Sequence, residues 1–223
     1  MKTIGIIAAM ESEMQGLVAK MENVRVHTHA SLPYYCGTLC GASVIVCLCG
    51  VGKVNAAMHT QILIDRYAPD CIIQNGVAGS LSNEVGCFDI VIGSELVYHD
   101  MQPWVLDQFE PLQQSYQADA ELVRIASELI PQAHIGRIAT GDQFVSEAQQ
   151  RASIAQQTHA LCTEMEGCAV AHTATLNEVP FLVLRSISDM ADGSAQVDFP
   201  TFAQKAADRA VELLLQMLPV LAQ

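Results

Sequence analysis

Acidic side chains recur directly after the apolar runs of this sequence, at positions where the strands of a sheet would end. They are Glu11, Glu13, Glu164, Glu166 and Asp189. In open α/β sheets, ligands bind just beyond the carboxyl ends of the strands, so acids that are far apart in the chain can meet at one site. Carboxylates in different surroundings can serve as a general acid and a general base. The pattern therefore makes proton-transfer chemistry the first possibility to consider.

Each of these acids also has a purely structural explanation. Glu13 suits the first turn of a helix, where the helix dipole favours negative charge. Glu164 suits a strand-to-helix junction; it shares a face with Glu166 if the strand stays extended, and the two diverge if a helix begins between them. Asp189 suits the cap of a turn. It follows the apolar run FLVL, however, and burial there would raise its pKa, as a proton donor requires.

Two glycine-rich segments do not fit the common phosphate-binding motifs. Segment 50–53 (GVGK) is flanked by Cys47 and Val54, where a P-loop needs Gly and Ser or Thr. Segment 76–79 (GVAG) lacks the GxGxxG pattern and does not follow the first strand. The sequence therefore gives no support to a triphosphate site and little to dinucleotide binding. A tight turn at 76–79 that lets backbone approach a small ligand remains open.

The bulk composition is that of a folded protein that does not bind nucleic acid. The 223 residues include 51% hydrophobic residues, carry a formal net charge of −13 and contain no basic run. A solvated acidic surface explains this charge without any function. The N-terminal apolar stretch ends at Glu11, so we expect neither a signal peptide nor a membrane span, and therefore a cytoplasmic protein.

The cysteines are expected to be free thiols. Most lie in apolar runs and none belongs to a CxxC pair, which is typical of buried thiols in a reducing compartment. A metal site would need Cys or His clustered at ligand spacing, so we expect no bound metal. The eight cysteines are Cys36, Cys40, Cys47, Cys49, Cys71, Cys87, Cys162 and Cys168.

The elements that must position these residues alternate along the chain. Apolar runs rich in β-branched residues predict strands at 3–9, 43–49, 70–75, 88–95, 134–140, 160–164 and 181–188. Helical patterns cover 54–67, 118–129, 147–157, 167–177 and 202–218, with Asp198 and Pro200 as suitable starting residues for the last helix. The alternation predicts a single three-layer α/β domain over residues 1–223, whose central mixed sheet is mainly parallel and flanked by helices.

One long irregular segment, residues 99–117, interrupts this alternation. It contains the only tryptophan of the chain, Trp104, and two prolines. Loops of this length in a compact domain are usually functional or interfacial. We therefore expect a lid or a dimer contact there.

Several motifs together resemble the 5′-methylthioadenosine/S-adenosylhomocysteine nucleosidases of the purine nucleoside phosphorylase superfamily. In chain order they are IGIIAAMESEM, GVGKVNAA, NGVAGSL, VYHD, TGDQFV, EMEGCAVAH and VPFLVLRSISDMAD. The ordered set is far more specific than any single motif. The resemblance implies a nucleoside phosphorylase-like fold, a homodimer, and hydrolysis that frees adenine from a 5′-thio-substituted adenosine without a cofactor or metal.

The same resemblance implies roles for the acids. Glu13 would be the general base that positions and activates water. Asp189 would protonate adenine N7, with Ser188 helping to orient it. Glu166 would hold the ribose 2′ and 3′ hydroxyls, and Met165 would pack beside the sugar. These roles suit the reaction, because breaking an N-glycosidic bond leaves positive charge on the ribose and negative charge on the base.

The remaining contacts with the substrate are also implied by the resemblance. Phe144 would stack on the adenine, and the backbone of Val145 would read the edge of the purine. Met10 would line the ribose and the alkylthio end. The other substrate-binding positions are Ala78 and Gly79, as a backbone floor beneath the sugar, and Glu164.

Some positions depart from the family pattern. Residues 101–106 (MQPWVL) differ from the apolar residues that family members contribute across a dimer interface to cap the 5′-thio group. Val77 stands where some relatives have Ser. The preferred 5′ substituent therefore stays open, and a futalosine-type adenosine derivative is an alternative substrate.

Two other activities compete with hydrolysis. A phosphorylase of the same superfamily would need Arg residues near the glycine-rich segments to clamp phosphate, and the sequence puts none close to 50–52 or 76–79. Arg185, inside the last strand, has a structural ion pair as its simpler explanation. A silent nucleoside-binding module would be expected to lose Glu13 or Asp189, and both are present.

Overall fold

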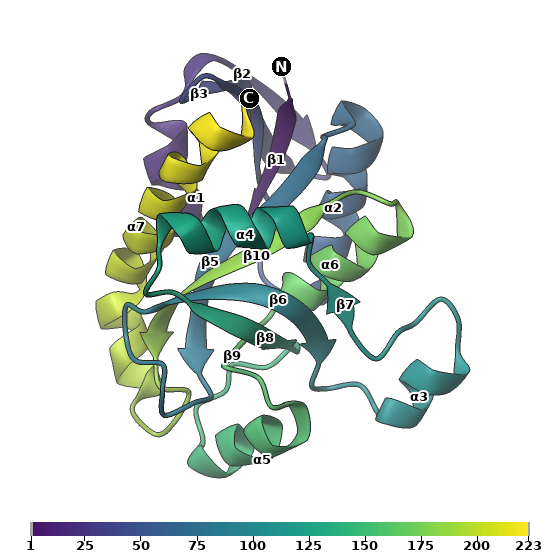
Figure 1. Ribbon diagram of the computed structural model, residues 1–223, viewed down its shortest axis with the longest axis vertical. Helices are drawn as coiled ribbons and strands as arrows, with labels where there is room; N and C mark the ends of the chain where they lie inside the picture. The colour runs from purple at the N-terminus through teal and green to yellow at the C-terminus, as the bar shows by residue number, and fades with distance from the viewer. Residues whose placement is uncertain (1, 223) are drawn as a thin grey trace.

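The structure is a computed structural model that describes residues 2–222, with residue 196 described by its backbone alone. Within these residues ten strands form one sheet, with helices around it (Figure 1). The strands are β1 (Thr3–Ala8), β2 (Glu22–His29), β3 (Leu32–Leu39), β4 (Ala42–Leu48), β5 (Cys71–Ser80), β6 (Ile90–Tyr98), β7 (Tyr116–Gln117), β8 (His134–Thr140), β9 (Cys162–Glu164) and β10 (Phe181–Asp189). The helices are α1 (Glu11–Val18), α2 (Lys53–Tyr67), α3 (Pro103–Gln108), α4 (Ala120–Leu129), α5 (Ala148–Thr158), α6 (Gly167–Leu176) and α7 (Ala195–Leu221).

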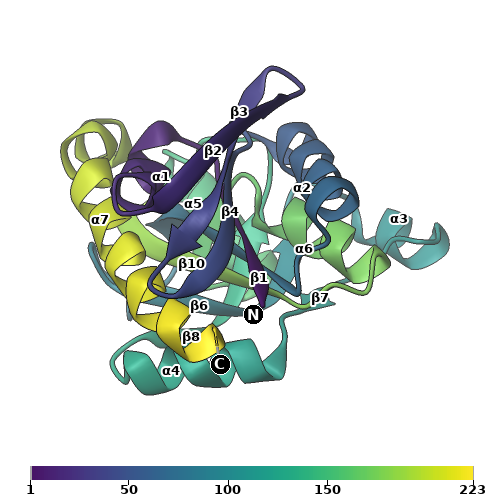
Figure 2. The same ribbon diagram turned by 90° about the horizontal axis from the view of Figure 1, so that it is seen from above.

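The centre of the sheet is parallel. Strands β4, β1, β5 and β10 lie side by side and run in the same direction. Strand β10 also pairs with β6, which continues through β8 and β9 back to β5, so these five strands close into a ring. At the other end, β3 and β2 form an antiparallel hairpin that projects from the body (Figure 2). The expected mixed α/β sheet is therefore confirmed.

Helices cover both faces of the sheet, because the central strands are apolar on both faces. In β1, Ile4 and Ile6 belong to a core shared with α1, α4 and α7, whereas Ile7 points the other way, into a core shared with α2 and α6. Figure 2 shows α1 and α7 on one side of the sheet and α2 and α6 on the other. This gives the three layers that the alternation of patterns predicts.

Two boundaries differ from the prediction at places that matter for the site. Strand β5 continues to Ser80, so residues 76–79 are extended strand and form no tight turn. Helix α7 begins at Ala195, before both Asp198 and Pro200, which the sequence suggested as its starting residues. Pro200 lies inside it; the missing N–H costs one backbone hydrogen bond, and the preceding turn still forms through the N–H groups of Val197 and Asp198, which donate to the carbonyl of Ser194.

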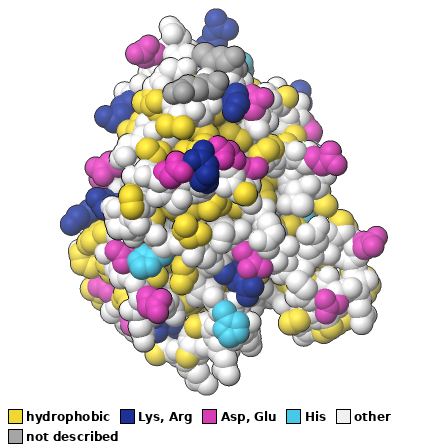
Figure 3. Space-filling view, in the orientation of Figure 1, with side chains coloured by type: hydrophobic (Ala, Val, Ile, Leu, Met, Phe, Trp, Pro, Cys, Tyr) yellow, Lys and Arg dark blue, Asp and Glu magenta, His cyan; other side chains and the backbone are white. Residues whose placement is uncertain are grey.

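On the face in Figure 3, Lys and Arg side chains are dispersed among acidic ones. Within residues 2–222, no helix is both long enough and apolar enough to cross a membrane.

Candidate active site

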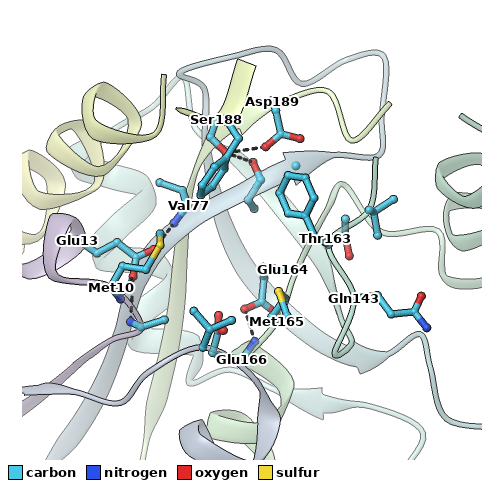
Figure 4. Close-up of a pocket in the computed structure, with 17 residues that line it drawn as sticks. Met10, Glu13, Val77, Gln143, Thr163, Glu164, Met165, Glu166, Ser188 and Asp189 are labelled. Carbon is cyan, nitrogen blue, oxygen red and sulfur yellow. Dashed lines mark hydrogen bonds between the residues drawn. The ribbon is translucent and has the colours of Figure 1, made fainter. Parts of the chain in front are cut away.

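The ends of β1, β5, β9 and β10 meet at a cavity of about 260 Å³. Every residue that the sequence assigned to the site lines it, and Figure 4 shows Glu13, Asp189 and Glu166 approaching it from different sides. The assigned residues are Met10, Glu13, Ala78, Gly79, Phe144, Val145, Glu164, Met165, Glu166, Ser188 and Asp189. Acids distant in the sequence are thus brought to one space.

Glu13 lies in the first turn of α1, and backbone N–H groups hold its carboxylate. Oε2 accepts hydrogen bonds from the N–H groups of Ala9 and Met10, both at 2.9 Å, and Oε1 accepts one from Val77 at 3.0 Å. Burial raises the pKa of Glu13, although the charge of Arg185 and these hydrogen bonds act against it. The carboxylate is therefore fixed in direction and takes up a proton more readily than an exposed Glu.

Asp189 is the last residue of β10 and is buried. Its Oδ2 accepts a hydrogen bond from Ser188 Oγ at 2.8 Å, and its Oδ1 accepts one from the N–H of Ala191 at 2.9 Å. Burial raises its pKa, while the bonds from Ser188 and Ala191 lower it by less. Turn capping and desolvation, which the sequence left as alternatives, therefore occur together. A buried carboxyl with a raised pKa is suited to donating a proton near neutral pH.

Arg185 is the fully buried cation beneath the cavity. Its guanidinium forms an ion pair with Glu164 and lies 3.8 Å from Glu166 Oε2. The structural ion pair expected for Arg185 is therefore confirmed. The expectation that no Arg approaches segment 76–79 is wrong, because β10 pairs Arg185 with Gly76 on β5, where Nη1 lies only 2.1 Å from the place a Cβ would occupy. The strand pairing that causes this is invisible in a linear sequence.

Glu164 uses its carboxylate oxygens within the protein. Oε1 accepts a hydrogen bond from Thr140 Oγ1, and Oε2 accepts bonds from the backbone of Glu166 and Gly167 in addition to Arg185. This side chain therefore ties β8, β10 and the start of α6 together at the wall of the cavity.

Glu166 is the N-cap residue of α6, and Met165 separates it from the end of β9. The strand ends at Glu164 and the helix begins only at Gly167. The strand therefore does not extend to Glu166, and no helix begins between the two acids. Glu166 Oε1 accepts the N–H of Gly52 at 2.8 Å. Burial, followed by the charge of Glu164, raises the pKa of Glu166 to about 8 against the opposing effect of Arg185.

The opposite wall is apolar. Phe144 is 47% exposed and meets Phe199 of α7 edge to face, with ring centroids 5.5 Å apart. Val145 is buried beside it, and Met10 and Met165 lie nearer the acids. An apolar slot next to buried carboxylates suits a flat ring joined to a polar group.

Six lining residues were not assigned from the sequence. All but Phe199 are next to assigned residues or lie within the motifs of the sequence analysis. The sequence therefore marked their neighbourhood but not their roles. Phe199 was missed because α7 starts earlier than its pattern predicts. The six are Ala9, Val51, Val77, Gln143, Thr163 and Phe199. For metals, residues 2–222 contain no group of three His, Cys, Asp or Glu side chains arranged to hold an ion.

Comparison with known proteins identifies the family. The Phosphorylase superfamily matches residues 3–219. The 5′-methylthioadenosine/S-adenosylhomocysteine nucleosidase of Staphylococcus carnosus (strain TM300) is 36% identical over 96% of this chain and 98% of that protein.

Solved structures agree with the sequence comparison. The nucleosidase of the same name from Neisseria meningitidis, in complex with methylthio-immucillin-A, has a TM-score of 0.95 and 32% identity, covering 99% of this chain and 100% of that one. The futalosine hydrolase of Helicobacter pylori has a TM-score of 0.92 and 28% identity, with 97% of each chain covered. The chain therefore belongs to the phosphorylase superfamily and, within it, to the 5′-methylthioadenosine/S-adenosylhomocysteine nucleosidases.

Proposed function

We propose that this protein hydrolyses the N-glycosidic bond of 5′-methylthioadenosine and S-adenosylhomocysteine, releasing adenine and the 5′-thio-substituted ribose. The observation that carries the proposal is that Glu13 and Asp189, from opposite ends of the chain, line one cavity that also has an apolar wall. The Neisseria relative holds an analogue with a methylthio group in its structure, which supports the substrate class.

The acid is Asp189. Breaking the bond transfers electrons to the purine, so a proton delivered to adenine N7 makes the base a better leaving group. Burial keeps the Asp189 carboxyl protonated at a higher pH than usual. The bond from Ser188 Oγ to its Oδ2 fixes the direction of that carboxyl.

The base is Glu13. Its carboxylate takes a proton from water as the water oxygen bonds to the anomeric carbon, from which the adenine departs. Hydrogen bonds from Ala9, Met10 and Val77 keep it directed at the cavity. Negative charge near the sugar also stabilises an oxocarbenium-like transition state.

The ribose lies between the acids. Glu166 accepts hydrogen bonds from the 2′ and 3′ hydroxyls, and Met165 packs beside the sugar, above the backbone of Ala78 and Gly79. Glu164 contributes to this wall, and its role is to hold Arg185 and the start of α6, because its own oxygens already have partners within the protein. The substrate contact that the resemblance implies for Glu164 stays a prediction, because this residue also lines the cavity.

Purine and 5′ group occupy the apolar part of the cavity. Phe144 stacks on adenine, the backbone of Val145 reads its edge, and Met10 lines the ribose and alkylthio end. Val51 and Phe199 add apolar surface to the same cavity. A thioether has no strong hydrogen-bonding group, so an apolar lining suits it.

Water is a better fit than phosphate as the second substrate. The described residues that line the cavity include four carboxylates and neither Lys nor Arg. Arg185, beneath it, is already paired with Glu164. A phosphate would therefore enter a site lined by carboxyl groups, without the bidentate clamp that usually holds it.

We also propose a homodimer of single domains spanning 1–223, in the cytoplasm. Trp104 and Phe109, on and after α3, are 51% and 54% exposed, and hydrophobic side chains are visible on the lobe that α3 forms (Figure 3). Such exposed aromatic surface is typical of protein contacts. The described cysteines are all free thiols, which suits a reducing compartment.

The test is product chromatography with and without phosphate over a panel of 5′-substituted adenosines. We expect free adenine from methylthioadenosine in the absence of phosphate. Ribose 1-phosphate and a phosphate requirement would move the protein to the phosphorylases. Faster release from a futalosine-type compound would support the alternative that the Helicobacter hydrolase represents. No release from any compound would leave a silent binding module.

A further inference from the structure

The amino end of α2 contacts both halves of the cavity. The N–H of Gly52 donates to Glu166 Oε1 at 2.8 Å, and the next N–H, that of Lys53, donates to Asp142 Oδ1, also at 2.8 Å. Glu166 stands on the ribose side, and Asp142 begins the segment that carries Phe144. Two consecutive peptide groups thus set the spacing between the two sides of the site.

A side-chain ion pair also links the start of α2 to Asp142. Lys53 Nζ lies 2.7 and 2.6 Å from the two carboxylate oxygens of Asp100, and Asp100 Oδ2 accepts the N–H of Asp142 at 2.9 Å. Lys53 Nζ is also 3.7 Å from Asp142 Oδ2. The Lys53 and Asp100 side chains are only 20% and 14% exposed, so solvent screens this pair less than a surface pair.

These contacts hold segment 142–145 at its first residue, while Val145 is buried at its other end. The segment has no regular secondary structure, and its backbone neighbourhood includes two further hydrogen bonds, Gly141 N–H to the Glu164 carbonyl at 3.1 Å and Gln143 N–H to the Gly141 carbonyl at 2.8 Å. Asp142 is therefore held from α2 on one side and from the end of β6, through Asp100, on the other. Neither Lys53 nor Asp100 lines the cavity itself.

We propose that Lys53 and Asp100 are positioning residues that hold segment 142–145 for the purine. The ion pair fixes Asp142, and Asp142 fixes the position of Phe144 and Val145 relative to Glu166. A binding wall that is ordered in advance spares the ligand the entropy cost of ordering it. The inference rests on the proposed function, because that function assigns the purine to this wall.

The experiment compares two variants that break the pair from either side, Asp100→Asn and Lys53→Met. Calorimetry measures the dissociation constants of adenine and of 5-methylthioribose, and steady-state assays give KM and kcat for methylthioadenosine. We expect adenine to bind about tenfold more weakly to each variant, which corresponds to about 1.4 kcal/mol. Binding of 5-methylthioribose should stay unchanged, because the backbone of Gly52 still holds Glu166. KM should rise by more than kcat falls.

Controls separate positioning from general stability. Lys53→Arg should restore most adenine affinity, and Lys53→Met should add little in the Asp100→Asn background, because the two residues act as one unit. Glu95→Gln is the matched control; it breaks the partly buried ion pair of Glu95 with Arg137, 2.8 Å apart between β6 and β8, and should leave adenine binding unchanged.

The outcomes distinguish this inference from the function on which it rests. If adenine binds both variants as tightly as the wild type, or if both ligands are lost equally, the positioning role is overturned. If the variants lose adenine affinity selectively while the wild type releases no adenine from methylthioadenosine, positioning stands and the proposed reaction fails. Each variant is informative alone should the other not fold.

Discussion

Asp189 and Glu13 are both buried carboxylates, but different neighbours surround them. Around Asp189 the nearby charges are acidic, from Asp198 and Asp192, and they raise its pKa further. Around Glu13 the nearby charge is that of Arg185, which lowers its pKa. Burial raises the pKa of both groups, and the opposite effects of their neighbours suit the proposed roles of Asp189 as the acid and Glu13 as the base.

Replacing either acid should remove most of the activity. For Asp189→Asn and for Glu13→Gln we expect kcat for methylthioadenosine to fall by roughly 10²- to 10⁴-fold, the usual contribution of one proton-transfer group. The amides keep the size of the acids, so KM should change much less. Steady-state kinetics gives both numbers. A variant that retained wild-type kcat would remove its acid from the mechanism.

Glu166 predicts how stability depends on pH. Its pKa of about 8 in the folded protein lies above the ordinary value of 4.5, so the folded state keeps a proton that the unfolded chain releases. The stability from this difference is complete below pH 4.5 and is lost as the pH rises through about 8. Between about pH 5 and about 9 the Tm of the wild type should therefore fall relative to that of Glu166→Gln. Scanning calorimetry would detect this, and parallel curves would contradict it.

At the scale of elements, the pairing of β5 with β10 leaves space for Arg185 only because position 76 is glycine. A Cβ there would lie 2.1 Å from Arg185 Nη1 and 2.7 Å from Glu13 Oε1. Gly76→Ala should therefore destabilise the protein by about 1–3 kcal/mol, as overpacking usually does, and lower kcat by displacing Glu13. Urea unfolding measures the first effect. Gly193→Ala, whose added Cβ meets nothing within 4 Å, is the control.

Sequence patterns predicted the central strands of the sheet and missed several other elements, β2 among them. The strand from Phe181 was predicted because every residue in it is buried and most are apolar. Strand β2 was missed because nearly all of its residues are exposed, Val24 and Val26 included, so no hydrophobic face marks it. Glycines at 76 and 79 suggested a turn, whereas the structure uses them in an extended strand where side chains approach closely.

The candidate site was likewise predictable only in part. Motifs identified the acids and the purine-side residues, since their types carry the chemistry. The contacts among Arg185, Glu164 and Gly76 depend on which strands are neighbours, and β10 pairs with β5 across more than a hundred residues of sequence. Local pattern contains no information about such a pairing.

For the whole molecule, the exposed aromatic residues of segment 99–117 predict the assembly state. Trp104→Asp puts a charge into the proposed dimer contact and should shift the protein toward monomer, because charge is disfavoured at the centre of interfaces. Sedimentation velocity measures the shift, and Glu121→Gln on the exposed face of α4 is a neutral comparison. A wild type that sediments as a monomer at all concentrations would exclude the homodimer.

The ring of β5, β10, β6, β8 and β9 has a further consequence. Every strand of this closed ring pairs on both sides, so separating the ring into two parts requires breaking two ladders. Its amide protons should accordingly exchange with deuterated water far more slowly than those of segment 142–145 or the β2–β3 arm. The strands that carry Glu164 and Asp189 would then keep their positions through each turnover.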